Sequence, residues 1–278
     1  MLLPPVTVNP APAPGVATIF NRPLVGLEGL LRLIGPDGRV VTYCRGELGE
    51  HVASYAAGAL TSIQRHYGRG AAWAARANDW QPATPGAPAL VDRYVRTRVS
   101  SGVGAQDSCY FFLQPLGAGD VVVSRRDGFL VAVTCAVRTA SLVGSVGWCG
   151  LYGAPIVPAD VATSAPDVFG VGWRADAPDL TLRLFRRSGV GAHSIVTLPL
   201  VRDDALRTMC FYARAGGPFI GVAILDHESG AFFNQVYTDA IPALDAPLVV
   251  EAVQGNWFTG QVVSQDVISA YARWGAPR

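Results

Sequence analysis

The sequence predicts a mainly β protein, an antiparallel jelly-roll-like β-sandwich preceded by a small α+β N-terminal domain. First, from about Asp120 onward short apolar runs follow one another with almost no helical period. Second, every other residue within 128–138 is apolar, as in a strand with one buried face. Third, the run 218–226 is almost continuously apolar, which is typical of a strand buried on both faces. Because every strand needs partners for its backbone groups, so many strands must close into a sandwich or barrel.

Turn residues separate the predicted strands, for example at Arg126–Gly128 and His227–Gly230. Two strands are expected early, at Val91–Val99 and Cys109–Leu113. The later strands are expected near 120–125, 128–138, 145–152, 167–174, 180–186, 193–200, 207–214, 218–226, 231–238, 247–254 and 261–274.

The chain divides into three predicted segments. Residues 1–18 are a proline-rich arm, which is either a disordered tail or an extended arm laid against a neighbouring subunit. Residues 19–88 are a small attachment domain and a linker. This domain should hold a hairpin within Leu30–Tyr43 and a helix from Glu47 to about Tyr67, whose apolar residues recur at three- and four-residue steps. Residues 89–278 are the β-sandwich head.

The composition is apolar for a soluble monomer: half of the 278 residues are hydrophobic, 15% are charged, and the mean hydropathy is +0.28. The roughly 18 consecutive apolar residues that a spanning helix needs do not occur, so membrane insertion is not expected. Burial of apolar surface in a homo-oligomer is the better interpretation. All 22 basic residues are arginine, but the net charge is only +1, so no nucleic-acid partner is indicated.

Catalytic and cofactor motifs are missing from the sequence, which contains no phosphate-binding loop, no Gly-x-Ser-x-Gly and no His-Glu-x-x-His. The five cysteines are irregularly spaced, and Cys135, Cys149 and Cys210 lie in apolar patterns, which favours structural thiols over a disulfide frame or metal site. A dyad of Cys210 with His193 rests on residue type alone. We therefore expect no catalytic residues, no cofactor and no metal. The N-terminus lacks the features of a secretory signal, so we expect synthesis in the bacterial cytoplasm.

Aromatic and amide groups near loops make glycan contacts conceivable. Trp257, with Gln254 and Asn256, lies in a predicted loop at 254–260, and the turn at Asp176 and Asp179 adds carboxylates that can accept bonds from sugar hydroxyls. Trp148, Trp173, Tyr152 and Tyr237 are weaker stacking candidates, because aromatic residues in strands usually belong to the core. A glycan-cleaving enzyme would need only two carboxylates. Its candidates are Asp176, Asp179, Asp203, Asp204, Asp226, Glu228, Asp239, Asp245 and Glu251.

The order of short motifs from about Gly128 to Trp274, a little over half of the chain, is similar to a family of C-terminal head domains. These domains belong to fibres, spikes and decoration proteins of tailed phages and phage-derived particles such as gene-transfer particles. The matching pieces are Arg126–Phe129, Gly147–Leu151, Phe169–Gly172, Asp179–Leu184, Val196–Pro199, Cys210–Ala213, Ile220–Leu225, Gly230–Phe233, Asp239–Pro242 and Asn256–Trp257.

The resemblance implies a non-enzymatic structural protein on the surface of a virion or phage-like particle. Its N-terminal part would attach to other particle proteins, and its sandwich would bind a host cell-surface polysaccharide. It also implies symmetric self-association, with a trimer expected. Two alternatives stay open: a polysaccharide depolymerase with paired carboxylates, and a purely architectural capsid or tail subunit. Head or tail location and the identity of any receptor glycan are not determined by the sequence.

Overall fold

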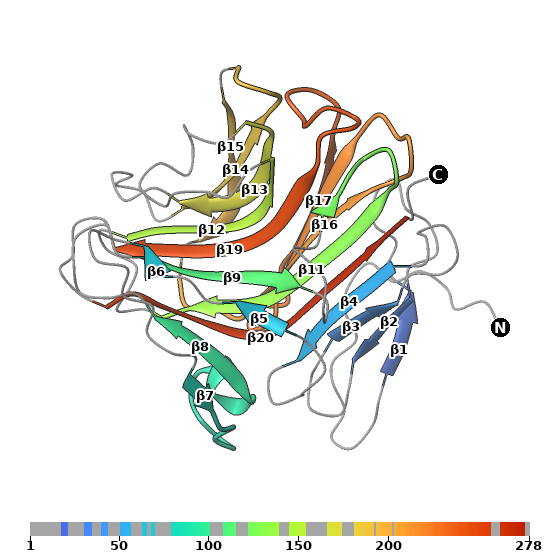
Figure 1. Cartoon of the computed structure of the whole chain (residues 1–278). Helices are drawn as coiled ribbons and strands as arrows, with labels where there is room; N and C mark the ends of the chain where they lie inside the picture. The colour runs from blue at the N-terminus through green and yellow to red at the C-terminus, as the bar shows by residue number, and fades with distance from the viewer. Residues whose placement is uncertain are drawn as a thin grey trace.

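The computed structural model describes residues 18–21, 31–34, 40–43, 51–56, 63–65, 68–69, 79–100, 108–114, 122–138, 145–153, 166–173, 181–191, 193–201, 203–256 and 262–275. These residues form two large antiparallel sheets stacked as a β-sandwich, together with a separate three-stranded sheet (Figure 1). The predicted fold class, mainly β and a sandwich, is therefore confirmed.

The first large sheet has nine strands in the order β15-β14-β13-β12-β19-β9-β5, with β10 paired to β19 and β6 to β9. Its strands are β5 (Ile63–Arg65), β6 (Gly68–Arg69), β9 (Ser108–Gln114), β10 (Val122–Val123), β12 (Ser145–Tyr152), β13 (Val168–Trp173), β14 (Thr181–Arg187), β15 (Ser194–Val201) and β19 (Leu248–Asn256).

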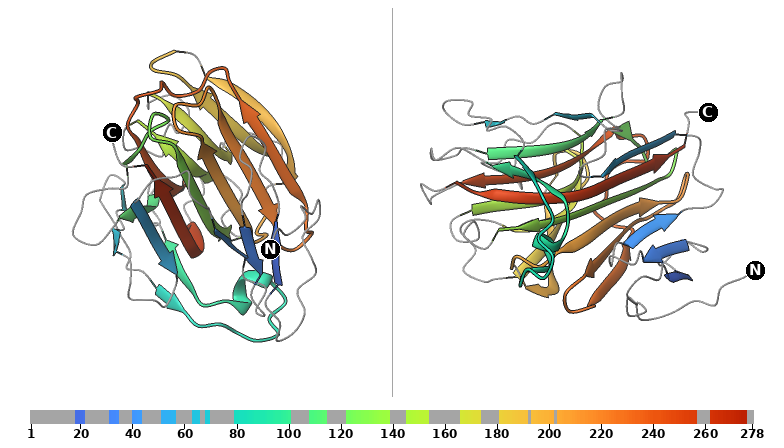
Figure 2. Two further views of the ribbon diagram at one scale, coloured as in Figure 1. Left: turned by 90° about the vertical axis from the view of Figure 1, so that its right-hand side faces the viewer. Right: turned by 90° about the horizontal axis from the view of Figure 1, so that it is seen from below.

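The second large sheet has eight strands in the order β18-β17-β16-β11-β20-β8-β7, with β4 also paired to β20. Its strands are β4 (His51–Ala56), β7 (Asp79–Gln81), β8 (Arg96–Ser100), β11 (Phe129–Val137), β16 (Arg207–Ala213), β17 (Ile220–Asp226), β18 (Phe232–Tyr237) and β20 (Ser264–Trp274). The strands of the two sheets lie in two layers in Figure 2.

The core lies between the layers and follows the predicted alternation. In β11 the side chains of Phe129, Val131, Val133 and Cys135 are buried in it, and Val137 packs against it. They face residues of the other sheet such as Leu151 and Phe169. Strand β17 is buried along its whole length, as its apolar run predicts. Val222 and Ile224 face the main core, while Ala223 lies on the other side of the sheet in a second apolar cluster with Leu130, Cys210 and Tyr212.

A short 3-10 helix, η1 (Leu90–Arg93), overlaps the start of the strand expected at Val91–Val99, and β8 begins only at Arg96. Val91 is buried together with Ala136 of β11, Leu206 and Ile268 of β20. The helical turn therefore anchors the segment before β8 on the eight-stranded sheet, away from the main core. Among the described residues no helix is long and apolar enough to cross a membrane.

The hairpin expected at Leu30–Tyr43 is present: β2 (Leu31–Ile34) pairs with β3 (Val40–Tyr43), and β1 (Thr18–Asn21) completes the small sheet. The helix predicted from Glu47 to Tyr67 is wrong, because its described residues form β4 and β5. Strand β20 explains the error. Its Ser264–Val267 half pairs with β8, and β4 pairs with the remaining Ser269–Trp274 half of the same edge. The backbone hydrogen bonds between β4 and β20 stabilise the strand more than the weak helical pattern of apolar residues stabilises a helix.

Strands β4 to β7 all precede residue 88, yet they pair with β20, β9 and β8, which follow it. The division into an arm (1–18), an attachment domain (19–88) and a head (89–278) stays a prediction.

Candidate functional site

Two of the predicted site segments leave the sandwich at the same end. Trp173, the last residue of β13, pairs with Gly147 of β12, and Asn256, the last residue of β19, pairs with Ser145 of the same strand. Both strands therefore finish within two residues of each other along β12. The segment that contains Asp176 and Asp179 follows Trp173, and the segment that contains Trp257 follows Asn256. We call this end of the sandwich, marked by Ser145, Trp173 and Asn256, the β12 end.

The predicted glycan-binding residues have different positions in the described chain. Gln254 and Asn256 belong to β19, so the loop expected at 254–260 begins later than predicted. The reason is that β12 extends to Ser145 and supplies a partner for β19 as far as Asn256. Trp257, Asp176 and Asp179 lie outside the described residues.

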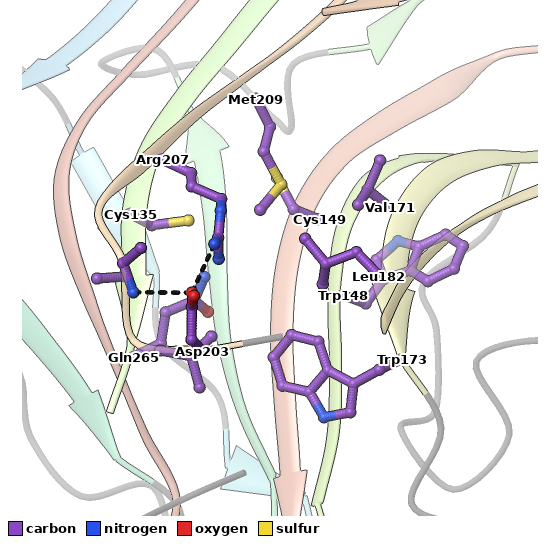
Figure 3. Close-up of a pocket in the computed structure, with 13 residues that line it drawn as sticks. Cys135, Trp148, Cys149, Val171, Trp173, Leu182, Asp203, Arg207, Met209 and Gln265 are labelled. Carbon is purple, nitrogen blue, oxygen red and sulfur yellow. Dashed lines mark hydrogen bonds and ion pairs between the residues drawn. The ribbon is translucent and has the colours of Figure 1, made fainter. Parts of the chain in front are cut away.

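A small cavity lies between the sheets at the β12 end (Figure 3). Trp173, Leu182, Asp203, Arg207 and Gln265 are among the residues that line it. Its free volume is about 20 Å³. A single water molecule needs roughly 10–15 Å³ on this scale, and a typical small-molecule pocket is more than ten times larger. The cavity is therefore far too small for a sugar ring, so a glycan at this end must bind on the surface.

The charged wall of this cavity is Arg207 of β16, a residue that is only 4% exposed. Its Nη2 atom lies 2.5 Å from a carboxylate oxygen of Asp203 and 2.9 Å from one of Asp226. Arg207 and Asp203 point toward one another in Figure 3. A buried guanidinium held by two carboxylates fixes the start of β16 to the end of β17, because charges out of water require such partners.

Asp226 also organises the turn that follows β17. Its Oδ1 atom accepts hydrogen bonds from the backbone N–H groups of Glu228, at 3.1 Å, and Ser229, at 2.9 Å. Burial alone would raise the pKa of the Asp226 carboxyl. The hydrogen bond from Ser229 and the positive charge of Arg207 outweigh that effect and lower the pKa below its usual value. Asp226 is therefore a structural anion, and the predicted turn at His227–Gly230 is confirmed, with Gly230 at a φ of 72°.

The thiols of Cys135 and Cys149 line the same cavity, and both residues are 2% exposed. Burial raises the pKa of Cys135 to about 11 and that of Cys149 well above its usual value. Because the thiolate is the nucleophile, these two groups are unreactive at neutral pH. Cys135, Cys149 and Cys210 are buried and are outside any disulfide, so the prediction of structural thiols is confirmed for these three residues.

The dyad of Cys210 with His193 is wrong. Cys210 is buried in the apolar cluster of the eight-stranded sheet with Leu130 and Tyr212. His193 instead precedes β15 in the nine-stranded sheet, where its Nε2 atom lies 3.2 Å from Arg187. The two residues belong to different sheets, and the Cys210 thiol is buried away from any substrate in solution.

The strand aromatics do not form stacking platforms, contrary to the weaker part of the prediction. Trp148, Tyr152, Trp173 and Tyr237 are all buried. The Trp148 ring packs against Tyr152 and Phe185, with ring centroids 5.2 and 5.1 Å apart. The indole N–H of Trp173 donates to Ser145 at 3.3 Å. These four rings are packed inside the protein and are not available to a sugar. Of the proposed stacking residues, only Trp257 keeps that role as a prediction.

Two of the candidate carboxylates lie near the opposite end of the sandwich and are paired with arginine. Asp239 accepts from Arg186 at 2.7 Å, and Asp245 accepts from Arg126. In each case the hydrogen bond from the guanidinium lowers the pKa of the carboxyl. The sequence gives a weak signal for the first of these pairs, since Arg186 lies inside the apolar strand β14.

A further charged cluster was not predicted. Asp266 of β20 is completely buried and is paired with Arg96 at 3.0 Å and Arg98 at 2.8 Å. Arg138 lies 3.3 Å from the same carboxylate and 3.0 Å from Asp92 of η1. The cluster fastens η1 and β8 to the sheet, and its members are too far apart in sequence for any motif to reveal it. In the described part of the chain no group of histidine, cysteine or carboxylate side chains could hold a metal ion.

No protein-family model matches the sequence, and no curated protein matches it significantly. Solved structures are similar in fold. A protein of unknown function from Shewanella oneidensis MR-1 has a TM-score of 0.52 and 14% identity over 83% of this chain and 91% of its own. Peanut lectin has a TM-score of 0.50 and 8% identity over 82% of this chain and 98% of its own. The family 7 alginate lyase A1-II′ matches more loosely, with a TM-score of 0.44 and 12% identity over 66% of this chain and 80% of its own.

The first two of these likenesses assign the chain a lectin-like β-sandwich fold. None of the matched structures quoted is named as a phage fibre or spike, so the resemblance of the sequence to phage head domains is supported only at the level of the β-sandwich.

Proposed function

We propose that this protein is a non-catalytic carbohydrate-binding β-sandwich that takes its ligand on the surface of the β12 end. The observation that carries the proposal is the shared exit of two segments beside β12, after Trp173 and after Asn256. These segments supply the groups that sugar recognition uses: an aromatic face in Trp257 and carboxylates in Asp176 and Asp179. Recognition on loops held by a rigid scaffold is the usual arrangement in sandwich proteins.

Two further observations support the proposal. The chain shares its fold with a lectin over most of its length. In addition, the cavity at the β12 end is too small for a sugar ring, which leaves the loop surface as the place for a glycan at this end.

Three of the described candidate carboxylates are unsuited to act as the general acid of a glycan-cleaving pair. A general acid in such an enzyme must stay protonated near neutral pH, so its pKa must be raised. The carboxyl pKa is instead lowered for Asp226, Asp239 and Asp245. The absence of catalysis is tested by incubating the protein with polysaccharides and measuring released oligosaccharide. Release that is lost in Asp176→Asn or Asp179→Asn would show that the protein is a polysaccharide-cleaving enzyme and would overturn the non-catalytic proposal.

The binding proposal is tested by screening the protein on a glycan array and measuring the dissociation constant of each hit. Trp257→Ala should weaken binding about fivefold or more, as expected for the loss of roughly 1 kcal/mol of stacking, with an unchanged melting temperature. Val190→Ala is the matched control, because Val190 is 85% exposed in the turn between β14 and β15 at the opposite end. Binding that both variants retain, or no glycan bound by the parent protein, would contradict the proposal.

A place on the surface of a virion or phage-like particle, and a host-surface polysaccharide as the ligand, are part of the same proposal. They rest on the motif order between Gly128 and Trp274. Immunogold labelling of particles from a producing strain would test them, and labelling confined to the cytoplasm would remove the particle from the proposal.

A further inference from the structure

The chain crosses from the nine-stranded sheet to the eight-stranded sheet between Val201, the last residue of β15, and Arg207, the first residue of β16. Both sides of this crossing lie at the β12 end. Val201 pairs with Thr181 of β14, which directly follows the proposed glycan-binding segment 174–180. Arg207 lines the cavity at the same end. Asp203, which belongs to the crossing, therefore lies at the end of the sandwich that is proposed to bind a glycan.

The carboxylate of Asp203 is held in place through one of its two oxygens. Oδ1 lies 2.5 Å from Nη2 of Arg207 and accepts a hydrogen bond from the backbone N–H of Ala205 at 3.1 Å. Within the described part of the chain, no group donates a hydrogen bond to Oδ2. The Asp203 side chain is 44% exposed. Asp203 thus presents an oriented acceptor to solvent, and an oriented group loses little conformational entropy when it binds a ligand.

Arg207 supplies a donor beside this acceptor. Its Nε atom is buried and has no hydrogen-bond partner among the described residues. Buried polar atoms in proteins almost always have a partner, so a group from outside the chain is expected here. The cavity that Arg207 and Asp203 both line has a free volume of about 20 Å³, which is enough for one oxygen-sized group. The two side chains point toward one another at this cavity (Figure 3).

We propose that Asp203 and Arg207 form a subsite for one hydroxyl group of a neutral sugar, an inference that rests on the proposed binding of carbohydrate at the β12 end. A hydroxyl group is both a donor and an acceptor, so it can donate to Asp203 Oδ2 and accept from Arg207 Nε. The exposed side of Asp203 marks the mouth of the cavity. The cavity admits a hydroxyl group but not a ring, so the rest of the sugar stays on the surface.

The charge at this end selects a neutral ligand over an acidic one. The guanidinium of Arg207 already has two carboxylate partners, Asp203 and Asp226. The segments 174–180 and 202–206 together contain two arginines and four aspartates, a formal excess of two negative charges. A uronate or another acidic sugar would bring a further negative charge against this surface, and such like-charge contacts weaken binding. The ligand class is therefore a neutral, hydroxyl-rich glycan.

The first test is an array that carries both neutral and uronate-containing glycans. The parent protein should bind neutral glycans in preference. For the neutral glycan that binds most tightly, Asp203→Asn should raise the dissociation constant about tenfold or more, because a charge-assisted hydrogen bond to the ligand is lost. The amide keeps an oxygen for Ala205 and Arg207, so the fold should persist.

The matched control is Asp245→Asn, which removes the same charge from an exposed carboxylate near the opposite end and should leave the dissociation constant unchanged. A parent protein that prefers uronate-containing glycans would overturn the subsite. So would an Asp203→Asn variant that binds like the parent, or equal losses of affinity in Asp203→Asn and Asp245→Asn.

Trp257→Ala separates this inference from the proposed function. If Trp257→Ala weakens binding of the neutral glycan and Asp203→Asn does not, carbohydrate binding stands and the subsite is wrong. If the parent protein binds no glycan at all, both are wrong.

A second test needs no variant and covers the case in which Asp203→Asn does not fold. Carboxyl groups are labelled with a carbodiimide and glycine ethyl ester, and the modified peptides are identified by mass spectrometry. In the free protein Asp203 should be modified, whereas Asp226, which is only 5% exposed, should not. A saturating concentration of the neutral glycan should reduce labelling of Asp203 severalfold and leave labelling of Asp245 unchanged. Equal labelling of Asp203 with and without the bound glycan would overturn the subsite.

Discussion

The guanidinium of Arg207 lies 2.9 Å from the carboxylate of Asp226, and the two residues are only 4% and 5% exposed. They come from adjacent strands, where Arg207 of β16 is directly opposite Asp226 of β17. The pair thus joins the start of β16 to the end of β17 at the β12 end, with two charges that have almost no access to water. Its removal should affect stability far more than the loss of a pair on the surface.

Asp226→Asn should lower the free energy of unfolding by about 2–3 kcal/mol, because it leaves a buried guanidinium with Asp203 as its remaining carboxylate partner. Asp245→Asn is the control, since it breaks an ion pair to Arg126 whose side chains are both 62% exposed and should change stability little. Urea titrations of the three proteins measure the difference. Equal losses of unfolding free energy in both variants would show that burial of the Arg207–Asp226 pair adds nothing to its contribution to stability.

The stability that Asp226 contributes should depend on pH in one direction. Its pKa is lowered in the folded protein, so the unfolded chain takes up a proton first as the pH falls. The contribution is therefore complete above the unfolded pKa of about 3.9 and is lost as the pH drops through the folded value. Thermal melts from pH 7 to pH 2 should show the gap between the parent protein and Asp226→Asn closing only below about pH 4. A gap that closes between pH 7 and pH 5 would contradict this assignment.

Gly147→Ala should destabilise the β12 end. A Cβ at this position would overlap the Trp173 indole, which is buried and donates to Ser145. We expect a loss of about 1–3 kcal/mol, typical of overpacking. Gly191→Ala should be neutral, because a Cβ there meets its nearest atom at an ordinary 3.5 Å.

A double-mutant cycle checks that the clash with Trp173 causes the loss. Gly147→Ala combined with Trp173→Leu should lose less stability than the sum of the two single variants, because the smaller side chain makes room for the new methyl group. Additive losses would show that the two positions do not interact.

Cys135 and Cys149 should resist alkylation in the native protein. With a pKa of about 11, Cys135 is a thiolate in only about one molecule in 10⁴ at pH 7, and burial also raises the pKa of Cys149 well above its usual value. Iodoacetamide labelling followed by peptide mass spectrometry should find both residues unmodified in buffer and fully modified in urea. Fast labelling of either in buffer would mean that this part of the sandwich opens.

The candidate site was predictable only in part. Local pattern pointed to segments around Asp176 and Trp257, and strand pairing supports their grouping by ending β13 and β19 beside β12. The pattern could not show that Trp148 and Trp173 are core, because an aromatic residue in a strand looks the same from either face. Nor could it pair Arg207 with Asp226 or Arg96 with Asp266, since ion pairs across a sheet join residues up to 170 positions apart.

The sequence by itself determined the β class and most strand positions, because alternation and turn residues act over a few neighbours. Strand β12, for example, occupies Ser145–Tyr152 as predicted, and the run 218–226 became a strand buried along its length. Only the tertiary structure decided which strands pair, and this is why 51–56 became β4 on the free half of the β20 edge in place of a helix. The physical reason is the same in each case: backbone hydrogen bonds between strands must be satisfied, and their partners are set by contacts far apart in the chain.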